Sequence, residues 1–168
     1  RGRRVLVLGA GVAGVEAGRV LAGRGHEVEV WERSERPGGQ MPLAVAAPDK
    51  EEAAPIWSYR WQEVGALGVP VRTGKVATAD NVRAYAPDFA IVATGAAPRP
   101  APFDISALDP RIRVLHAWDY LGEPARIESG ARVLVVGGGM VGMEAADLLL
   151  APGADVGVLE AAAGGAKG

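Results

Sequence analysis

The chain has 168 residues, a formal net charge of −2, 49% hydrophobic and 5% aromatic residues, 24 glycines and no cysteine. Its length suits one domain or one and a part, its weak charge argues against a nucleic-acid partner, and no apolar run approaches the roughly 18 residues that would predict a membrane span. Within this chain the absence of cysteine excludes a C-x-x-C redox pair, cysteine-ligated iron–sulfur clusters and thiol catalysis, so electron transfer here would have to use a bound organic cofactor.

Residues 5–32 form the clearest unit of the sequence. An apolar run at residues 5–8 passes directly into the glycine-rich segment 9–14, GAGVAG, and a stretch with helical spacing of its apolar residues then runs to Gly25. A second run of β-branched residues follows and ends in Glu32. This order predicts a strand, a tight turn, a helix and a second strand that carries an acid at its end.

Each glycine of this turn has a physical role in a dinucleotide site. Gly9 permits the positive φ of a tight strand-to-helix turn, Gly11 leaves room for a pyrophosphate beside the main chain, and Gly14 lets the helix lie against the strands. The N–H groups at the start of the helix favour a phosphate, and Glu32 can accept hydrogen bonds from both hydroxyls of an adenosine ribose. A glycine-rich turn without a ligand is the alternative interpretation.

A loop follows at residues 33–42, as its proline and glycines indicate. The pair Gly38-Gly39 allows the main chain to approach another group closely. Because the pair comes soon after Glu32, we interpret that group as the dinucleotide running on from the first helix. An ordinary turn is the alternative.

Residues 48–68 are predicted to form a helix that starts near Asp49 and is interrupted by Pro55. Trp57 and Trp61 stand among apolar residues at helical spacing. Packing is the main interpretation of these aromatic residues, and a partner surface is the alternative.

The middle of the chain predicts a series of short elements. In chain order we expect a strand at 69–76, a crossover helix at 78–86, a buried strand at 87–95, a connecting loop at 96–110, a short element at 114–121 and a lead into the next strand at 123–130. Thr78 or Asp80 would cap the crossover helix. Four prolines in the connecting loop should oppose helix formation there.

Residues 132–160 repeat the opening unit, with the turn GGGMVG at 137–142 and the acid Glu160. At the shift that takes Gly9 to Gly137, identical residues recur at Val5, Leu6, Val7, Gly9, Gly11, Gly14, Glu16, Ala17, Leu21, Gly25, Val28, Val30 and Glu32. The interval from first glycine to final acid is the same in both copies. We therefore predict two dinucleotide sites, a second βαβ unit that is incomplete, and a poorly ordered tail at 161–168.

Two such units, with Gly38-Gly39-Gln40 after the first and Ala93-Thr94-Gly95 between them, resemble the two-dinucleotide-domain flavoproteins. The segments 46–48, 96–99 and 117–119 narrow the resemblance to the C-terminal part of the dienoyl-CoA reductase and trimethylamine dehydrogenase group, which are old-yellow-enzyme-like NADH:flavin oxidoreductases. The resemblance implies an α/β fold with a Rossmann-like parallel sheet and flanking helices. It also implies an FAD- or ADP-binding domain at 1–128 and the start of an NAD(H)-binding unit at 129–168.

The resemblance also implies which residues contact each cofactor. Those expected around FAD, or ADP in its place, are Gly9, Gly11, Val12, Ala13, Gly14, Glu32, Arg33, Gly38, Gly39, Gln40, Val76, Ala93, Thr94 and Gly95. Those expected to face NAD(H) are Gly137, Gly139, Met140, Val141, Gly142 and Glu160. No catalytic side chain is predicted, and the two histidines, His26 and His116, are too far apart in sequence to suggest a metal site.

In that family an N-terminal barrel carries FMN, an iron–sulfur cluster and the groups that handle substrate, and none of it is in this chain. We therefore predict a module or subunit that passes electrons between a nicotinamide cofactor and flavin, accompanied by a catalytic flavoprotein or iron–sulfur subunit or by missing domains. The alternative is a non-catalytic ADP- or FAD-binding interaction domain that docks a catalytic flavoprotein subunit through the face at 57–67. A disulfide reductase of the glutathione reductase type is excluded because the chain has no cysteine.

Two further expectations concern the nicotinamide cofactor and the compartment. Glu160 is followed by two alanines and has no arginine beside it, so a 2′-phosphate would meet a carboxylate and NAD should be preferred to NADP. The first residues lead directly into a strand without a cleavage-site pattern, which favours a cytoplasmic protein without a signal peptide.

Overall fold

The computed structural model describes residues 2–122 and 127–161. It divides into two compact units, one of the residues up to 42 together with 52–96, and one of residues 43–51 together with the described residues after 96. The predicted tail from 162 onward and residues 123–126 of the predicted lead lie outside the described residues. The predicted division by cofactor at residue 128 stays a prediction.

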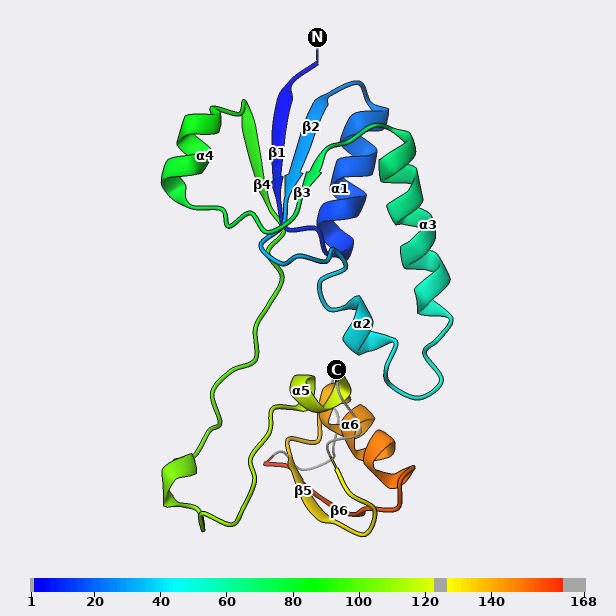
Figure 1. Cartoon of the computed structure of the whole chain (residues 1–168), viewed down its shortest axis with the longest axis vertical. Helices are drawn as coiled ribbons and strands as arrows, with labels where there is room; N and C mark the ends of the chain where they lie inside the picture. The colour runs from blue at the N-terminus through cyan, green and yellow to red at the C-terminus, as the bar shows by residue number, and fades with distance from the viewer. Residues whose placement is uncertain (1, 123–126, 162–168) are drawn as a thin grey trace. The chain divides into compact units, whose positions relative to one another are not determined.

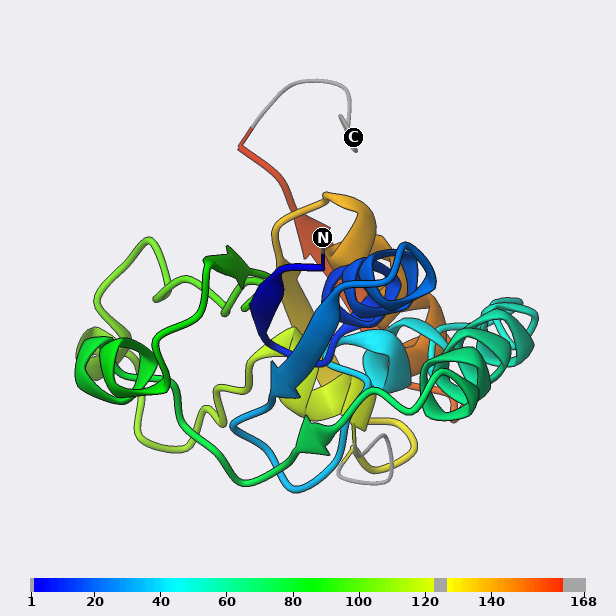
Figure 2. The ribbon, with the colours of Figure 1, turned by 90° about the horizontal axis from the view of Figure 1, so that it is seen from above.

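A four-stranded parallel sheet organises the first unit (Figure 1). Its strand pairing gives the order β3-β2-β1-β4. Its elements are β1 (Arg4–Leu8), α1 (Val12–Gly23), β2 (Glu27–Trp31), α3 (Ala53–Ala66), β3 (Val71–Arg72), α4 (Ala79–Tyr85) and β4 (Phe89–Val92). Helices α1 and α3 lie on one side of the sheet and α4 lies on the other (Figure 2). Parallel strands joined by helices on both sides confirm the predicted Rossmann-like α/β fold.

The core of this unit lies between the sheet and the helices α1 and α3. Val7 of β1 and Val30 of β2 are paired in register and fully buried. They pack with Val15 of α1 and Val64 of α3. Burying such side chains stabilises the fold by roughly 1.5–3 kcal/mol each, so this core holds the N-terminus of α1 at the carboxyl ends of the strands.

Three of the predicted elements differ from the structure. Helix α3 begins at Ala53, and Pro55 lies in its first turn, where the missing N–H breaks no intrahelical bond. The predicted strand at 69–76 is reduced to the two residues of β3. The predicted buried strand is β4, but Phe89 is 59% and Val92 73% exposed, because β4 is an edge strand and α1 packs on β1 and β2.

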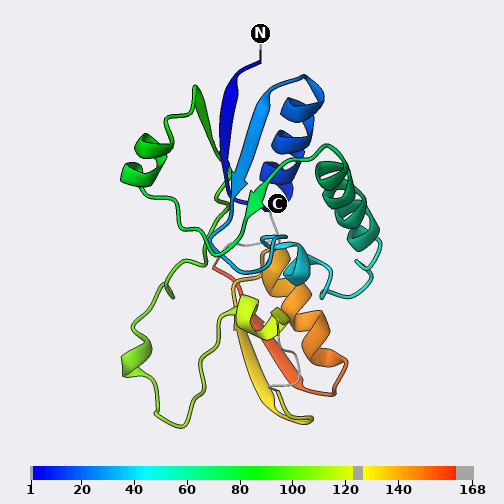
Figure 3. The ribbon, with the colours of Figure 1, turned by 45° about the horizontal axis from the view of Figure 1, so that its top comes forward.

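The second unit contains the parallel pair β5 (Arg132–Val136) and β6 (Asp155–Leu159), connected through α6 (Met140–Leu150). Figure 3 shows α6 running along this pair of strands. Tyr120 of α5 (Ala117–Gly122) packs with Ala145 and Leu149 of α6. The connecting loop contains one short 3-10 helix, η1 (Ile105–Ala107), and α2 (Met41–Ala44) spans the boundary between the two units. Throughout the described ranges every helix is too short or too polar to cross a membrane.

Candidate functional site

The first glycine turn connects β1 to α1 at the carboxyl edge of the sheet. Gly9 has φ 107°, and its N–H donates a 2.7 Å hydrogen bond to the carbonyl of Trp31 at the end of β2. A Cβ placed at Gly9 would lie 2.3 Å from the carbonyl oxygen of Ala93, which follows β4. Both the positive φ and the close main-chain neighbour require glycine, as the sequence predicts.

Gly14 and Gly11 have different roles in this turn. A Cβ at Gly14 would lie 1.8 Å from the carbonyl oxygen of Gly9, so only glycine lets α1 start this close to the turn. A Cβ at Gly11 would meet only Gly39 Cα, at 3.7 Å, so the space beside Gly11 is not filled by protein. No side chain caps α1, whose N-cap is Gly11, and Val12 and Ala13 of its first turn are exposed. Open space at an uncapped helix N-terminus fits the phosphates of a dinucleotide.

Glu32 is buried where β2 ends and is held by three hydrogen bonds. Its Oε2 accepts from the N–H of Ala10 at 2.7 Å, and its Oε1 accepts from the N–H of Ser34 at 2.9 Å and from Ser34 Oγ at 2.6 Å. Burial raises the pKa of Glu32, but the bonds from Ser34 and Ala10 and the charge of Arg33 outweigh it, and the pKa lies below its ordinary value. The carboxylate is therefore ionised and fixed beside the glycine turn, as an acceptor for ribose hydroxyls must be.

The loop with Gly38 and Gly39 closes on the same turn. Gly38 is buried, has φ 125° and donates from its N–H to the carbonyl of Ala10 at 2.9 Å. Gly39 has φ 56°, and a Cβ there would lie 3.0 Å from Gly11 Cα. The structure thus brings together two glycine segments that are separated in sequence, at the place where a pyrophosphate would lie.

The remaining residues predicted for the first site lie around this centre. Thr94 is exposed and directly follows Ala93, beside the turn, and Gly95 has φ 70°. A Cβ at Gly95 would lie 3.6 Å from Gln40 Nε2. Val76 is exposed, and its carbonyl accepts from Asn81 Nδ2 at 2.8 Å.

The second glycine turn connects β5 to α6 with nearly the same geometry. Gly137 has φ 109° and donates to the carbonyl of Leu159 at 2.8 Å, and a Cβ at Gly142 would lie 1.8 Å from Gly137 O. Gly139 is the N-cap of α6 and leaves the helix without a side-chain cap, and no atom of the described residues lies within 4 Å of a Cβ placed on it. Met140 and Val141, in the first turn of α6, are exposed.

Glu160 holds in this turn the place that Glu32 holds in the first. Its Oε2 accepts from the N–H of Gly138 at 2.6 Å. A Cβ on Gly138 would lie 3.1 Å from the Glu160 Cβ, so the carboxylate lies directly beside the turn. The predicted repeat is therefore a structural repeat, with two uncapped helix N-termini each accompanied by a carboxylate.

Two residues of the first site were not predicted from the sequence. Ser34 donates twice to Glu32, and a serine shortly after a strand end is a general turn signal that does not specify this partner. Lys75 donates from its N–H to the carbonyl of Glu32 at 2.8 Å, and its Nζ lies 3.7 Å from the ring centroid of Trp31. In the part of the chain that the structure describes, no group of three or more histidine, cysteine or acidic side chains could hold a metal ion.

The sequence profile of one protein family, described as pyridine nucleotide-disulphide oxidoreductase, matches residues 3–164. An NADH oxidase from Thermoanaerobacter brockii is 36% identical over 94% of this chain and 24% of its own length. The structure of a 2-naphthoyl-CoA reductase in complex with 2-naphthoyl-CoA matches with a TM-score of 0.80 and 32% identity, over 94% of this chain and 23% of that one. The structure of a histamine dehydrogenase from Rhizobium sp. 4-9 matches with a TM-score of 0.80 and 25% identity, over 97% of this chain and 26% of that one.

These relatives are oxidoreductases of the predicted kind, and the chain spans about a quarter of the length of each. The profile covers both glycine turns and both acids. The predicted cofactor classes, FAD and a nicotinamide dinucleotide, are those that this family binds. Although the family name mentions a disulphide, these 168 residues contain no cysteine, so the shared feature is the dinucleotide-binding fold.

Proposed function

The chain belongs to the pyridine nucleotide-disulphide oxidoreductase family, and on that basis we propose that it is the dinucleotide-binding part of an NADH-dependent flavin oxidoreductase. FAD would lie at the first glycine turn, and NADH would lie at the second. When bound, these two cofactors supply hydride transfer. The residues of this chain bind and orient them, and no side-chain acid or base is needed for that step.

The repeated geometry carries this proposal. At both turns a main-chain N–H of the turn donates to a glutamate that stands 22 positions further on, Glu32 or Glu160. Among the residues that the structure describes, no side chain caps the helix N-terminus at either turn. A carboxylate beside an open helix N-terminus suits the ribose and the phosphates of an adenine dinucleotide.

We assign NADH, in preference to NADPH, to the second site. Glu160 lies beside that turn, and the two residues that follow it are alanines. A 2′-phosphate would be placed next to the Glu160 carboxylate, and neither of the two alanines after it can supply a positive charge. The NADH oxidase among the relatives is named for the same reductant.

Other chains or domains would complete the enzyme. Because this chain spans about a quarter of its relatives, we propose that a catalytic barrel, with its own flavin and iron–sulfur cluster, supplies the substrate chemistry. It would be either a separate subunit or another part of the same protein. We place the reaction in the cytoplasm as part of this proposal.

Purification with added FAD tests the first site, and titration with NADH and NADPH tests the second. We expect a yellow protein with flavin absorbance in the visible blue, and tighter binding of NADH than of NADPH. A protein that binds neither FAD nor ADP would overturn the assignment of the first site, and tighter binding of NADPH would overturn the assignment of the second.

A second candidate function is a nucleotide-bound docking domain with ADP, in place of FAD, at the first turn. The observation that favours it is the exposure of large apolar side chains on α3. Ile56 is 67% and Tyr59 59% exposed, and a docking partner could cover them. A colourless protein that releases ADP on denaturation would support this function. Retained FAD that NADH reduces would exclude it.

A further inference from the structure

The loop at Gly38 and Gly39 closes the first site but has few bonds of its own. Gly38 donates to the carbonyl of Ala10 at 2.9 Å, and its own carbonyl accepts from the N–H of Met41 at 3.0 Å. Both glycines adopt positive φ. Glycine reaches many backbone conformations besides this one, so its main chain is ordered only where other contacts hold it. Packing must therefore help to fix the position of this loop.

The indole of Trp57 supplies that packing. A Cβ placed at Gly38 would lie 3.6 Å from Trp57 Cζ2 and 3.8 Å from its Cε2, so the edge of the ring faces Gly38 with room for little more than one methyl group between them. Trp57 stacks on Trp61, with ring centroids 6.0 Å apart and an interplanar angle of 22°. Both indoles pack against the core between the sheet and the helices, so core packing holds Trp57 on the side away from Gly38.

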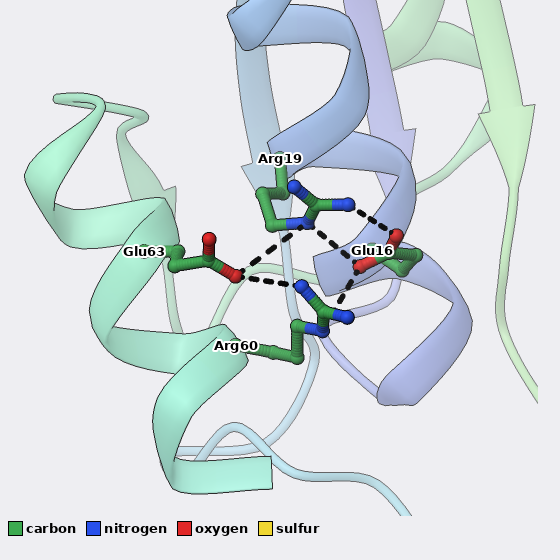
Figure 4. A network of polar contacts seen from close by, with 4 residues as sticks. All are labelled: Glu16, Arg19, Arg60 and Glu63. Carbon is green, nitrogen blue, oxygen red and sulfur yellow. Dashed lines mark hydrogen bonds and ion pairs between the residues drawn. The ribbon is translucent and has the colours of Figure 1, made fainter. Parts of the chain in front are cut away.

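Helix α3, which carries Trp57, is tied to α1, which starts at the phosphate turn. Figure 4 shows Glu16 and Arg19 of α1 facing Arg60 and Glu63 of α3. Arg60 Nη1 donates to Glu63 Oε2 at 2.8 Å, and Arg60 Nε lies 3.7 Å from Glu16 Oε2. Arg19 Nε lies 3.7 Å from Glu63 Oε2. Single exposed ion pairs contribute little, but four charges of alternating sign form a network that fixes the relative position of the two helices.

We propose that Trp57 is a positioning residue for the first dinucleotide site, which holds the Gly38-Gly39 loop in its binding conformation before the cofactor arrives. This inference rests on the proposed binding of FAD, or ADP, at that site. A loop that is already ordered loses less conformational entropy when the ligand binds, and affinity rises accordingly. Trp57 acts through the loop and does not itself contact the reacting atoms.

Hydrogen–deuterium exchange of the cofactor-free protein tests the effect on the loop directly. In Trp57→Ala we expect faster exchange of the amides at Gly38 and Met41, and in Trp57→Phe we expect exchange close to that of wild type. The exposed Ile56→Ala, one residue away on the same helix, is the matched control and should leave the exchange unchanged. If Trp57→Ala does not fold by circular dichroism, Trp57→Leu takes its place.

Ligand affinity separates positioning from general damage. We expect Trp57→Ala to raise the Kd for FAD about tenfold, with recovery in Trp57→Phe and no change in the Kd for NADH at the second turn. Unchanged loop exchange together with an unchanged Kd for FAD would overturn the inference, as would an equal loss of FAD and NADH affinity. Wild-type protein that binds neither FAD nor ADP would instead overturn the proposed function, and the exchange data would still report on the loop.

Discussion

The main-chain N–H of Ala10 donates a 2.7 Å hydrogen bond to Oε2 of Glu32, which joins the middle of the glycine turn to the end of the neighbouring strand. Gly138 and Glu160 form the same bond at 2.6 Å in the second turn. In both places the main chain of the turn itself anchors the carboxylate. An anchored acceptor needs no reordering when ribose hydroxyls bind, which favours affinity.

The two glutamates should therefore act on separate ligands. In Glu32→Gln the amide keeps the shape but loses the charge, so we expect FAD to bind about 10- to 100-fold more weakly, as for the loss of a charged hydrogen bond. NADH binding should not change. Glu160→Gln should show the reverse pattern, and calorimetric titration with each cofactor measures both effects.

The exposed Glu51→Gln is the matched control for the loss of one negative charge and should change neither affinity. Loss of both affinities in a single variant would contradict two independent sites.

Ser34→Ala tests the hydrogen bonds that keep Glu32 ionised. Because the folded pKa of Glu32 is lowered, its contribution to the free energy of unfolding is present above its ordinary pKa of 4.5 and is lost as pH falls through the lower folded value. Removing Ser34 Oγ brings the pKa of Glu32 in the folded state closer to its ordinary value. We expect the free energy of unfolding to fall by about 1–2 kcal/mol at pH 7, as for the loss of a hydrogen bond to a charged group. This difference from wild type should disappear in acid.

Urea unfolding followed by tryptophan fluorescence, at one pH above the ordinary pKa of the glutamate and one below its lower folded pKa, measures this difference. Ser106→Ala is the matched control. Ser106 Oγ donates a 2.7 Å hydrogen bond to Asp104 Oδ1, but this bond is exposed and water can replace it. An equal effect of Ser34→Ala at both pH values would show that the hydroxyl does not act through ionisation of Glu32.

Two glycines in helices should respond in opposite ways to alanine. Gly14→Ala places a Cβ 1.8 Å from the carbonyl oxygen of Gly9, so the turn must shift, with a loss of about 1–3 kcal/mol and weaker binding of FAD. Gly65 lies within α3, where no atom of the described part of the chain comes within 4 Å of a Cβ placed on it. Gly65→Ala should therefore stabilise the protein by about 0.5–1 kcal/mol. Thermal unfolding of both variants measures the contrast, and a neutral Gly14→Ala would be incompatible with the close approach.

Much of the geometry of the candidate site could be predicted because it depends on local sequence. A turn that needs glycine at fixed positions and an acid at a fixed interval leaves a pattern such as that of Gly9, Gly14 and Glu32, and its recurrence at Gly137 strengthened the prediction. Each strand-to-helix turn needs only residues close to each other in the chain. The fold class followed from the same pattern, because a strand, helix and strand in that order predict a parallel sheet.

Tertiary contacts could not be predicted in the same way. The pairing of Ser34 with Glu32 and the position of the Trp57 ring facing Gly38 depend on side-chain placement that periodicity does not encode. The exposure of β4 could not be predicted for a similar reason. Its apolar residues are typical of a buried strand, but its position at the sheet edge is a property of the whole fold. Asp49 predicts an earlier start of α3 than the one observed at Ala53, and Pro55 does not interrupt the helix because a residue of the first turn needs no N–H for an intrahelical bond.

The choice between NADH and NADPH can be tested by changing the charge beside the second turn. Glu160 lies at the end of β6, and Ala161 follows it at an exposed position. In Glu160→Ala/Ala161→Arg the repulsion of a 2′-phosphate is removed and a guanidinium that can bind it is added. We expect the ratio of NADH to NADPH affinity to fall about 10- to 100-fold, measured by fluorescence titration with each cofactor. Glu160→Ala alone should weaken the binding of NADH. It should change the ratio of NADH to NADPH affinity less than the double variant does, because it provides no new cation. A double variant that still favours NADH as strongly as wild type would show that Glu160 does not face the ribose, and that the discrimination arises elsewhere in the protein.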